Sequence, residues 1–387
     1  MSEILFEITK DNLETGMRGY PVGFCTTSYV DPQKGLFYMG RPVSQMKDFS
    51  PIQIIYLLYH GEEGSEEQVA AFSKIIQERS SVNPKVIDAI YSLPKEGHPM
   101  ELFASAVQIL GMVEKKDDYR EDCLNLIAKA PIIAAAVINY HAGWGKVTSY
   151  HPEKGYMENF TDMLLLKKED PQQLASVLRL FNILHYDHGG GNLSTFVGKA
   201  VASGLQNLYG AISAAMNALA GPRHGKANQD CLEFVKQVLK QLGENATPQQ
   251  MEQLLRERLQ KKELIYGFGH AVLRVEDARA TLFYNFAKEK FPQDSLLKIS
   301  LLLREVGTKI LSENPKITDP FPNVDIVSGS VLTAGGFAYP EYFTVLFGLS
   351  RVVGIAIQIV YERLEAREGK GTPIVRPKYL FKPKDHS

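Results

Sequence analysis

The chain has 387 residues, of which 44% are hydrophobic and 22% are charged, as in a soluble globular protein long enough for two domains. Its 43 basic and 44 acidic side chains give a net charge of −1, so overall charge does not favour nucleic acid or a membrane surface as a partner. Cys25, Cys123 and Cys231 lie far apart in the sequence. This cysteine usage favours a reducing compartment over a disulfide framework or a cysteine-based zinc site.

The N-terminal sequence MSEILFEITKDNLETGM lacks the basic start and long apolar core of a secretory signal. It is also more acidic than a typical organellar transit peptide, although a processed, mature chain stays open as an alternative. The most apolar stretch, PIIAAAVI at 131–138, is too short to span a bilayer. We therefore predict a cytoplasmic protein with no membrane partner.

The predicted elements begin with two short strand-like segments within the first 45 residues, GFCTTSYVD and KGLFYMG, joined by a turn. From about residue 50 the pattern becomes helical. SPIQIIYLLYHG (50–61) opens with a Ser-Pro cap signal and ends at glycine, and SEEQVAAFSKIIQERS (65–80) carries a Ser-x-x-Gln capping pattern. Apolar residues at helical spacing predict further helices at 98–113, 119–128, 131–141, 171–186, 192–203, 205–219, 225–243, 248–260, 275–290, 295–313 and 340–366. The fold class predicted is therefore all-α.

Glycine and proline mark four junctions in the second half of the chain, at GPRHG (221–225), IYGFGH (265–270), DPFPNVD (319–325) and AGGFAYP (334–340). The block between the first and last junction has helices of its own. We predict a large helical domain made of residues 1–224 and 337–387, with a smaller helical domain, residues 225–336, inserted into it. Glycines at both ends of the inserted block are suited to act as hinges.

Standard nucleotide-binding and hydrolase motifs are absent. GFGHAV lacks the third glycine and the βαβ context of a dinucleotide loop, and the chain has no G-x-S-x-G or HExxH. His185 and His188, in LHYDHGGGN, are three residues apart and could share a metal ion. Because the sequence offers no third ligand in suitable geometry, no metal site is predicted.

Two further histidines share a local sequence context. His224, in GPRHG, and His270, in GFGHAVLR, each follow glycine or proline and precede a helical segment. The positive end of a helix dipole disfavours a cationic imidazole, and a neutral imidazole can donate an N–H to a carbonyl oxygen and stabilise an enolate. For each histidine taken alone, a purely structural role in the core is an equal alternative.

A single carboxyl group, Asp325 in PNVDIVSG, stands between a Pro-Asn-Val turn and an apolar run. Burial would raise its pKa and make it a better general base, while capping of a helix is the alternative.

Arg351 interrupts an apolar helix face, where arginine is rarely buried without an anion. Guanidinium groups bind carboxylates through paired hydrogen bonds, so these groups together indicate a small polycarboxylate substrate and carbon-acid chemistry.

Six segments in chain order make the protein resemble the citrate synthase family from about Gly16 to Leu380: HYDHGGGN, MNALAGPRHGKANQ, YGFGHAVLRVEDAR, FPNVDIVSG, YFTVLFGLSR and IVRPKYL. The resemblance implies a nearly all-α fold of two domains in which the smaller domain closes over oxaloacetate. It also implies a homodimer that condenses acetyl-CoA with oxaloacetate and water to citrate and CoA, the entry step of the tricarboxylic acid cycle. It implies no cofactor and no metal, because acetyl-CoA is a co-substrate.

The resemblance also implies roles for individual residues. His224 would hydrogen-bond the thioester oxygen of acetyl-CoA, Asp325 would remove a methyl proton, and His270 would polarise and then protonate the carbonyl of oxaloacetate. The positions implied to bind oxaloacetate are His188, Arg279, Arg351 and Arg376, of which Arg376 would reach the site of the other subunit. The positions implied to bind CoA are Arg274 and Lys316.

Two positions depart from the family pattern near the expected CoA phosphates. Met39 stands where the family usually has arginine, although Arg41 is nearby, and Thr318 stands where a second lysine often accompanies Lys316. The contacts to the CoA phosphates therefore stay open.

Two alternatives to citrate synthase share its fold. One is a 2-methylcitrate synthase that uses propionyl-CoA, because one extra methylene in an apolar pocket changes discrimination by only about 1–3 kcal/mol. The other is a non-catalytic protein that binds CoA or a carboxylate. The presence of all three predicted catalytic side chains favours an enzyme.

Overall fold

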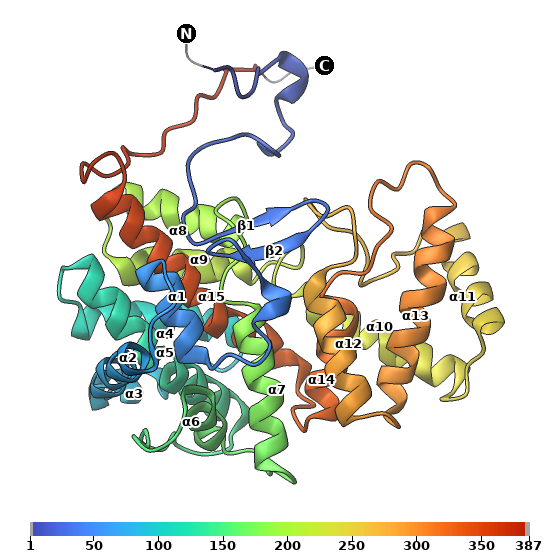
Figure 1. Ribbon diagram of the computed structural model, residues 1–387, viewed down its shortest axis with the longest axis horizontal. Helices are drawn as coiled ribbons and strands as arrows, with labels where there is room; N and C mark the ends of the chain where they lie inside the picture. The colour runs from blue at the N-terminus through green and yellow to red at the C-terminus, as the bar shows by residue number, and fades with distance from the viewer. Residues whose placement is uncertain (1–2, 384–387) are drawn as a thin grey trace.

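The computed structural model describes residues 3–383, and helices dominate this part of the chain (Figure 1). This confirms the all-α prediction. The fifteen α-helices within the described residues are α1 (Pro51–His60), α2 (Glu66–Glu78), α3 (Pro84–Ile90), α4 (Pro99–Glu114), α5 (Tyr119–Ala142), α6 (Tyr156–Met163), α7 (Pro171–Leu184), α8 (Leu193–Ser203), α9 (Leu208–Leu219), α10 (Ala227–Leu242), α11 (Pro248–Gln260), α12 (Ala278–Lys290), α13 (Ser295–Ser312), α14 (Asp325–Ala334) and α15 (Phe343–Val360).

The two predicted strands form an antiparallel hairpin, β1 (Ser28–Asp31) and β2 (Gly35–Tyr38), to which the two residues of β3 (Arg41–Pro42) are added. The hydroxyl of Tyr38 donates to the backbone carbonyl of Ile183 at 3.1 Å. This bond attaches the sheet to the C-terminal end of α7, where the chain enters the predicted site.

Residues 119–142 form one helix, α5, although the sequence predicted two helices divided near Pro131. Proline has no N–H to donate to the carbonyl four residues earlier, which here belongs to Ile127. The hydroxyl of Tyr156 in α6 donates to that carbonyl at 2.7 Å and replaces the missing bond. The helix therefore continues through the proline, and the predicted division is wrong.

Three helices were absent from the predicted set: α3, α6 and α14. They contain 7, 8 and 10 residues, so each offers few turns from which a helical period can be read. The predicted helix at 340–366 corresponds to α15 with a short 3₁₀ turn before it and a π-helical turn, Tyr361–Glu365, after it.

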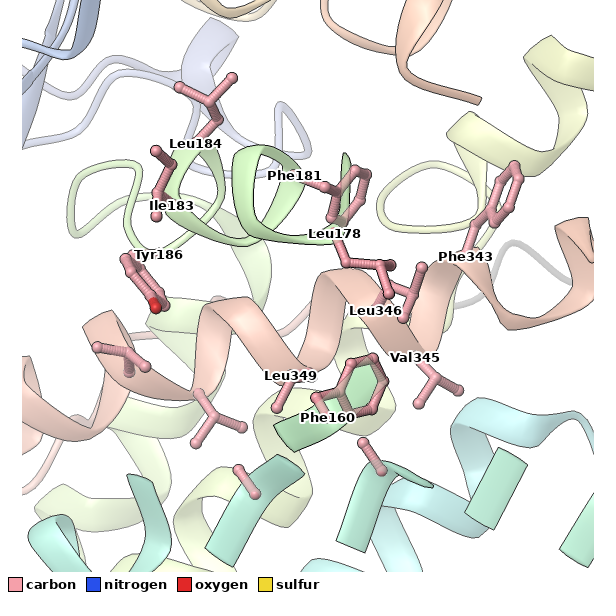
Figure 2. Close-up of a cluster of buried hydrophobic side chains, with 14 of the residues drawn as sticks. Phe160, Leu178, Phe181, Ile183, Leu184, Tyr186, Phe343, Val345, Leu346 and Leu349 are labelled. Carbon is pink, nitrogen blue, oxygen red and sulfur yellow. The ribbon is translucent and has the colours of Figure 1, made fainter. Parts of the chain in front are cut away.

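In the core α15 packs against α5, α9 and α7, and Figure 2 shows part of this cluster of buried side chains. Phe160 of α6, Phe181 of α7 and Leu349 of α15 are each at most 2% exposed. Burial of one such side chain contributes about 1.5–3 kcal/mol. Because α7 leads directly into His188 and α15 carries Arg351, this packing places two of the predicted site residues on rigid supports.

Two segments, Tyr119–Ala142 and Pro340–Glu365, are long and apolar enough to cross a membrane by length and composition. In each, 94% of the apolar stretch is buried inside the protein, as expected of core helices. The apolar run 131–138 is thus part of a longer helix than the sequence indicated.

The helices of the predicted inserted block, α10 to α14, lie together on one side of the molecule (Figure 1). Within this group α10 packs on α13 and α14, and α11 packs on α13. That residues 225–336 form a separate domain that closes over the site stays a prediction.

Gly354 lets α15 approach the loop that follows α7. A Cβ at this position would lie 2.4 Å from the backbone carbonyl oxygen of Tyr186 and 2.6 Å from the carboxyl carbon of Asp187. We expect Gly354→Ala to lower the free energy of unfolding by about 1–3 kcal/mol, because backbone must move to make room. Urea unfolding measures the change. Gly204→Ala is the control, since its Cβ would meet nothing nearer than 3.5 Å; equal stability of the two variants would contradict the expectation.

Candidate active site

The predicted site residues come from loops and helix ends that are far apart in the sequence. His188 follows α7, His224 lies between α9 and α10, and His270 lies between α11 and α12. Asp325 begins α14, and Arg351 lies inside α15.

His224 lies three residues before α10, as the sequence predicted. The backbone N–H of Ser194 donates to its Nε2 at 3.3 Å, and the Ser194 hydroxyl is 2.9 Å from the same nitrogen. Burial, with a contribution from the charge of Arg351, lowers the pKa of His224 to about 4. The ring is therefore neutral at neutral pH, with Nε2 as acceptor and its proton on Nδ1.

His270 does not precede a helix directly, which corrects the sequence prediction, because α12 begins eight residues later at Ala278. Its Nδ1 instead accepts the backbone N–H groups of Val272 and Leu273, both at 3.0 Å. These two donors act on the ring as a helix N-terminus would. Burial, and then the charge of Arg279, lowers the pKa of His270 to about 4. The neutral ring carries its proton on Nε2.

His188 faces His270, with 5.2 Å between the ring centres. Burial, followed by the charges of Arg279 and Arg351, holds the pKa of His188 well below its usual value. Its Nε2 is buried and has no hydrogen-bond partner within residues 3–383. A buried nitrogen without a partner is costly, so this atom is suited to meet a ligand.

His185, the other member of the histidine pair, points elsewhere. Its Nδ1 lies 2.7 Å from the carbonyl oxygen of Phe181, and its ring stacks on the Phe181 ring with 4.2 Å between centres. It is a satisfied core histidine. In the part of the chain that the structure describes, no group of three or more His, Cys, Asp or Glu side chains could hold a metal ion.

Asp325 is the first residue of α14, and its carboxyl group does not cap that helix. Within the described residues no hydrogen bond or ion pair reaches its carboxyl oxygens, while its backbone N–H donates to Oδ1 of Asn323 at 3.0 Å. Burial raises the pKa of Asp325 to about 6, although the charge of Arg279 opposes the change. The group is thus ionised at neutral pH and is a stronger base than an exposed aspartate.

Arg279 and Arg351 are 4% and 1% exposed, and the positive charges of their two guanidinium groups have different partners. Arg279 pairs with Asp277, whose oxygens accept from Nη2 at 2.7 Å and from Nε at 3.1 and 3.2 Å. Arg351 donates from Nε to the carbonyl of His185 at 3.0 Å and lies over the ring of Phe347. No hydrogen bond from its two terminal nitrogens occurs within the described residues, so Arg351 can bind an anion.

These two arginines connect the site electrostatically. The charge of Arg351 lowers the pKa of both His188 and His224, and the charge of Arg279 acts on His188, His270 and Asp325. The Coulomb energy between two charges falls as their separation grows, and the ring centres of His188 and His270 are 5.2 Å apart. The structure therefore brings these six predicted residues together around one place.

The two predicted CoA-binding residues lie outside this cluster. Arg274 is half-buried, and its Nη1 donates to the carbonyls of Leu273 at 2.6 Å and Val272 at 3.1 Å, which tightens the His270 loop. Lys316 is exposed on the connection between α13 and α14. Arg41, the residue near Met39, forms a surface ion pair with Glu63.

Arg376 is not brought to the site of its own chain. It is exposed in the C-terminal segment, which leaves the body of the molecule beside the N-terminal segment (Figure 1). Lys382 and Glu14 form an ion pair of 3.8 Å between these two segments.

Sequence reasoning missed four residues that complete the site: Ser194, Asp187, Asp277 and Asn323. Asp187 accepts from the hydroxyl of Thr27, from Gln358 Nε2 at 2.8 Å and from the backbone N–H of His188 at 2.8 Å. Asp187, Asp277 and Asn323 stand within quoted motifs and could have been noticed there. Ser194 could not, because its contact with His224 depends entirely on the fold.

Buried neutral imidazoles, a carboxyl group with a raised pKa and two buried guanidinium groups define an acid–base site for an anionic substrate.

The comparisons with known proteins agree with such a site. The family profile described as "Citrate synthase, C-terminal domain" matches residues 16–378. The mitochondrial citrate synthase of Citrus maxima is 36% identical, over 97% of this chain and 83% of its own. The chain belongs to the citrate synthase family.

Two further comparisons extend this result. The peroxisomal citrate synthase of Saccharomyces cerevisiae is 33% identical over 98% of this chain and 85% of its own. The solved structure of citrate synthase from Thermoplasma acidophilum, a ternary complex with carboxymethyl coenzyme A and oxaloacetate, has a TM-score of 0.82 at 24% identity and covers 96% of this chain and 97% of its own. This likeness confirms the fold.

The predicted cytoplasmic location is contradicted by these relatives, which are named as mitochondrial and peroxisomal proteins. The prediction rested on the acidic N-terminal sequence and the cysteine count. Neither property distinguishes the cytoplasm from the interior of such an organelle, because the folded domain has the same composition in either place.

The raised pKa of Asp325 generates a prediction about stability. The pKa of Asp325 is about 6 in the folded state, against an ordinary value of 3.8 that we take for the unfolded state. Its contribution to the free energy of unfolding is therefore fully present below pH 3.8 and is lost as pH rises through 6. The difference corresponds to about 3 kcal/mol. We expect Asp325→Asn to be more stable than the wild type by up to this amount at pH 8, and to match it near pH 4, in urea unfolding. A stability difference that does not change with pH would contradict the assignment.

Proposed function

We propose that the protein condenses acetyl-CoA with oxaloacetate and water to give citrate and CoA, the entry step of the tricarboxylic acid cycle. The observation that carries the proposal is the combination, at one site, of a base with a pKa near 6, neutral imidazoles and two buried arginines. The family membership supports the same substrates. So does the Thermoplasma structure of the same fold, whose own ligands are oxaloacetate and carboxymethyl coenzyme A.

The first step is removal of a methyl proton from acetyl-CoA by the carboxylate of Asp325. As this bond breaks, negative charge develops on the thioester oxygen. The Nδ1–H of His224 donates to that oxygen, because Nε2 is already occupied by the Ser194 N–H. A neutral donor of this kind stabilises an enol or enolate without carrying a charge of its own.

The second step joins the enolate carbon to the carbonyl carbon of oxaloacetate. His270 holds its proton on Nε2, because Nδ1 accepts two backbone N–H groups. Nε2–H polarises the oxaloacetate carbonyl, and the proton moves to its oxygen as the carbon–carbon bond forms. Water then hydrolyses the thioester of citryl-CoA, which gives citrate and the free thiol of CoA.

Oxaloacetate is held by donors that the described residues leave free. The terminal nitrogens of Arg351 and Nη1 of Arg279, whose Nε and Nη2 bind Asp277, pair with its two carboxylates, and the unpartnered Nε2 of His188 meets a third oxygen. Guanidinium groups suit this role because their paired donors match carboxylate geometry. Arg274 and Lys316 are proposed to contact CoA, and the reaction uses no further cofactor.

The proposed assembly is a homodimer in which Arg376 of each subunit completes the site of the other. Apolar side chains support it, because they are exposed along the same terminal segments. Phe381 is 92% exposed, Tyr379 91% and Phe24 82%. Exposed apolar surface of this kind marks contact surfaces, and a symmetric dimer would cover both segments at once.

The direct test is release of free thiol from acetyl-CoA in the presence and absence of oxaloacetate, without added metal. We expect release only when oxaloacetate is present, and a loss of at least about 100-fold in Asp325→Asn, because the base is removed. The variant should still be stabilised against heat by oxaloacetate, since a ligand that binds the folded state raises its stability.

Three outcomes would contradict the proposal. Much faster release from propionyl-CoA than from acetyl-CoA would indicate a 2-methylcitrate synthase. Stabilisation by oxaloacetate without any thiol release in the wild type would indicate a binding protein. Near-normal turnover of Asp325→Asn would remove that residue from the role of base.

Mixed dimers test the proposed role of Arg376. We expect Arg376→Ala and Asp325→Asn to be nearly inactive alone, and a mixture refolded together to recover about one quarter of the wild-type activity. Half of the dimers are then mixed, and one of their two sites combines an intact Asp325 with an intact Arg376 from the other chain. No recovery, in a mixture shown to contain mixed dimers, would place Arg376 in the site of its own subunit.

A further inference from the structure

The segment that carries His270 and the segment that carries Asp325 lie against each other through backbone contacts. Phe268 and Pro322 form an isolated antiparallel bridge. The backbone N–H of Gly269 donates to the carbonyl of Phe321 at 3.0 Å. A Cβ at Gly267 would lie 2.7 Å from Cβ of Ile326, so no larger residue fits at this contact without a shift.

Asn323 stands at the centre of this contact and bonds in three directions. Its backbone N–H donates to the carbonyl of Gly267 at 2.9 Å, and its side-chain Nδ2 donates to the carbonyl of Gly269 at 3.0 Å. Its side-chain Oδ1 accepts the backbone N–H of Asp325 at 3.0 Å. The carbonyl of Gly269 belongs to the peptide bond that leads into His270.

We propose that Asn323 is a positioning residue whose side-chain amide fixes the His270 loop and Asp325 relative to each other. The inference rests on the proposed function, since it assigns these two residues to one reaction. It goes beyond that function by assigning a role to a residue to which the proposed reaction gives none.

The chemistry of the amide explains why asparagine stands here. One end of the group donates and the other end accepts, so a single side chain satisfies both segments at the same time. A carboxylate can only accept, and it would therefore repel the carbonyl of Gly269. Alanine makes neither bond. Glutamine is one methylene longer and would push the two segments apart.

The arrangement matters because the proposed base and the proposed acid act on two molecules that must meet at bonding distance. A misplacement of about 1 Å in such a site costs roughly 100-fold in rate. Two of the proposed oxaloacetate-binding groups lie on other segments, because Arg351 is on α15 and His188 follows α7, while Arg279 is on α12. Loss of the Asn323 amide should therefore affect turnover more than oxaloacetate binding.

The test compares Asn323→Ala and Asn323→Asp with the wild type in the thiol-release assay. We expect kcat to fall about 10- to 100-fold in both variants, with the KM for oxaloacetate changed by less than about threefold. In Asn323→Asp the acidic limb of the pH profile of kcat, where activity falls as Asp325 is protonated, should also move to higher pH. The added carboxylate is two residues from Asp325 and raises the pKa of that group.

Asn207→Ala is the matched control for a purely structural effect. Oδ1 of Asn207 accepts the backbone N–H of Gly210 at 3.0 Å and caps α9 at the end opposite to His224. The control should lose thermal stability and keep its kcat. If Asn323→Ala fails to fold, Asn323→Asp alone decides, because it preserves the shape of the side chain.

Each outcome is decisive for the role of Asn323. A large loss of kcat with a nearly constant KM and an upward shift of the acidic limb supports it. The role is overturned if kcat is unchanged, or if kcat falls no more than it does in Asn207→Ala. It is also overturned if only the KM for oxaloacetate changes. If the wild type itself releases no thiol with oxaloacetate, the proposed function fails instead, and the two failures are thereby distinguished.

Discussion

The site depends on two guanidinium groups that are held almost completely out of water. Arg279 and Arg351 keep their charge in the interior because each has specific support, Asp277 for the first and the carbonyl of His185 with the ring of Phe347 for the second. Burial without such partners would be too costly. Exclusion of water, and then the positive field of these arginines, lowers the pKa of His188 and His270 and keeps both rings neutral. Burial raises the pKa of Asp325, and the charge of Arg279 opposes that rise.

The helical core makes that burial possible. The packing of α15 on α5, α9 and α7 provides a rigid support, part of which Figure 2 shows. The reactive groups lie in loops and at helix ends beside it. Asp187 connects these parts, because its carboxylate accepts from Thr27 beside the sheet, from Gln358 in α15 and from the backbone of His188. One buried carboxylate thereby joins the small sheet, the loop after α7 and the central helix.

Much of the fold could be predicted from local patterns. The caps at Ser50 and Ser65 and the hairpin near residue 30 are local features, and the structure confirms them. The division of α5 at Pro131 was wrong because a distant hydroxyl, that of Tyr156, supplies the bond that proline removes. The prediction that a helix dipole acts on His270 failed for a similar reason, since two loop N–H groups act there instead.

The sequence by itself determined which chemical groups are available and in what order they occur, and its motifs indicated the family to which the chain belongs. Side-chain identities and short-range caps are local properties, so they can be read without coordinates. Only the tertiary structure decided that His224, His270 and Asp325 share one environment and that Asn323 connects two of their segments. Their pKa values follow from burial by helices far away in the chain, and long-range packing of that kind is not visible in any local pattern.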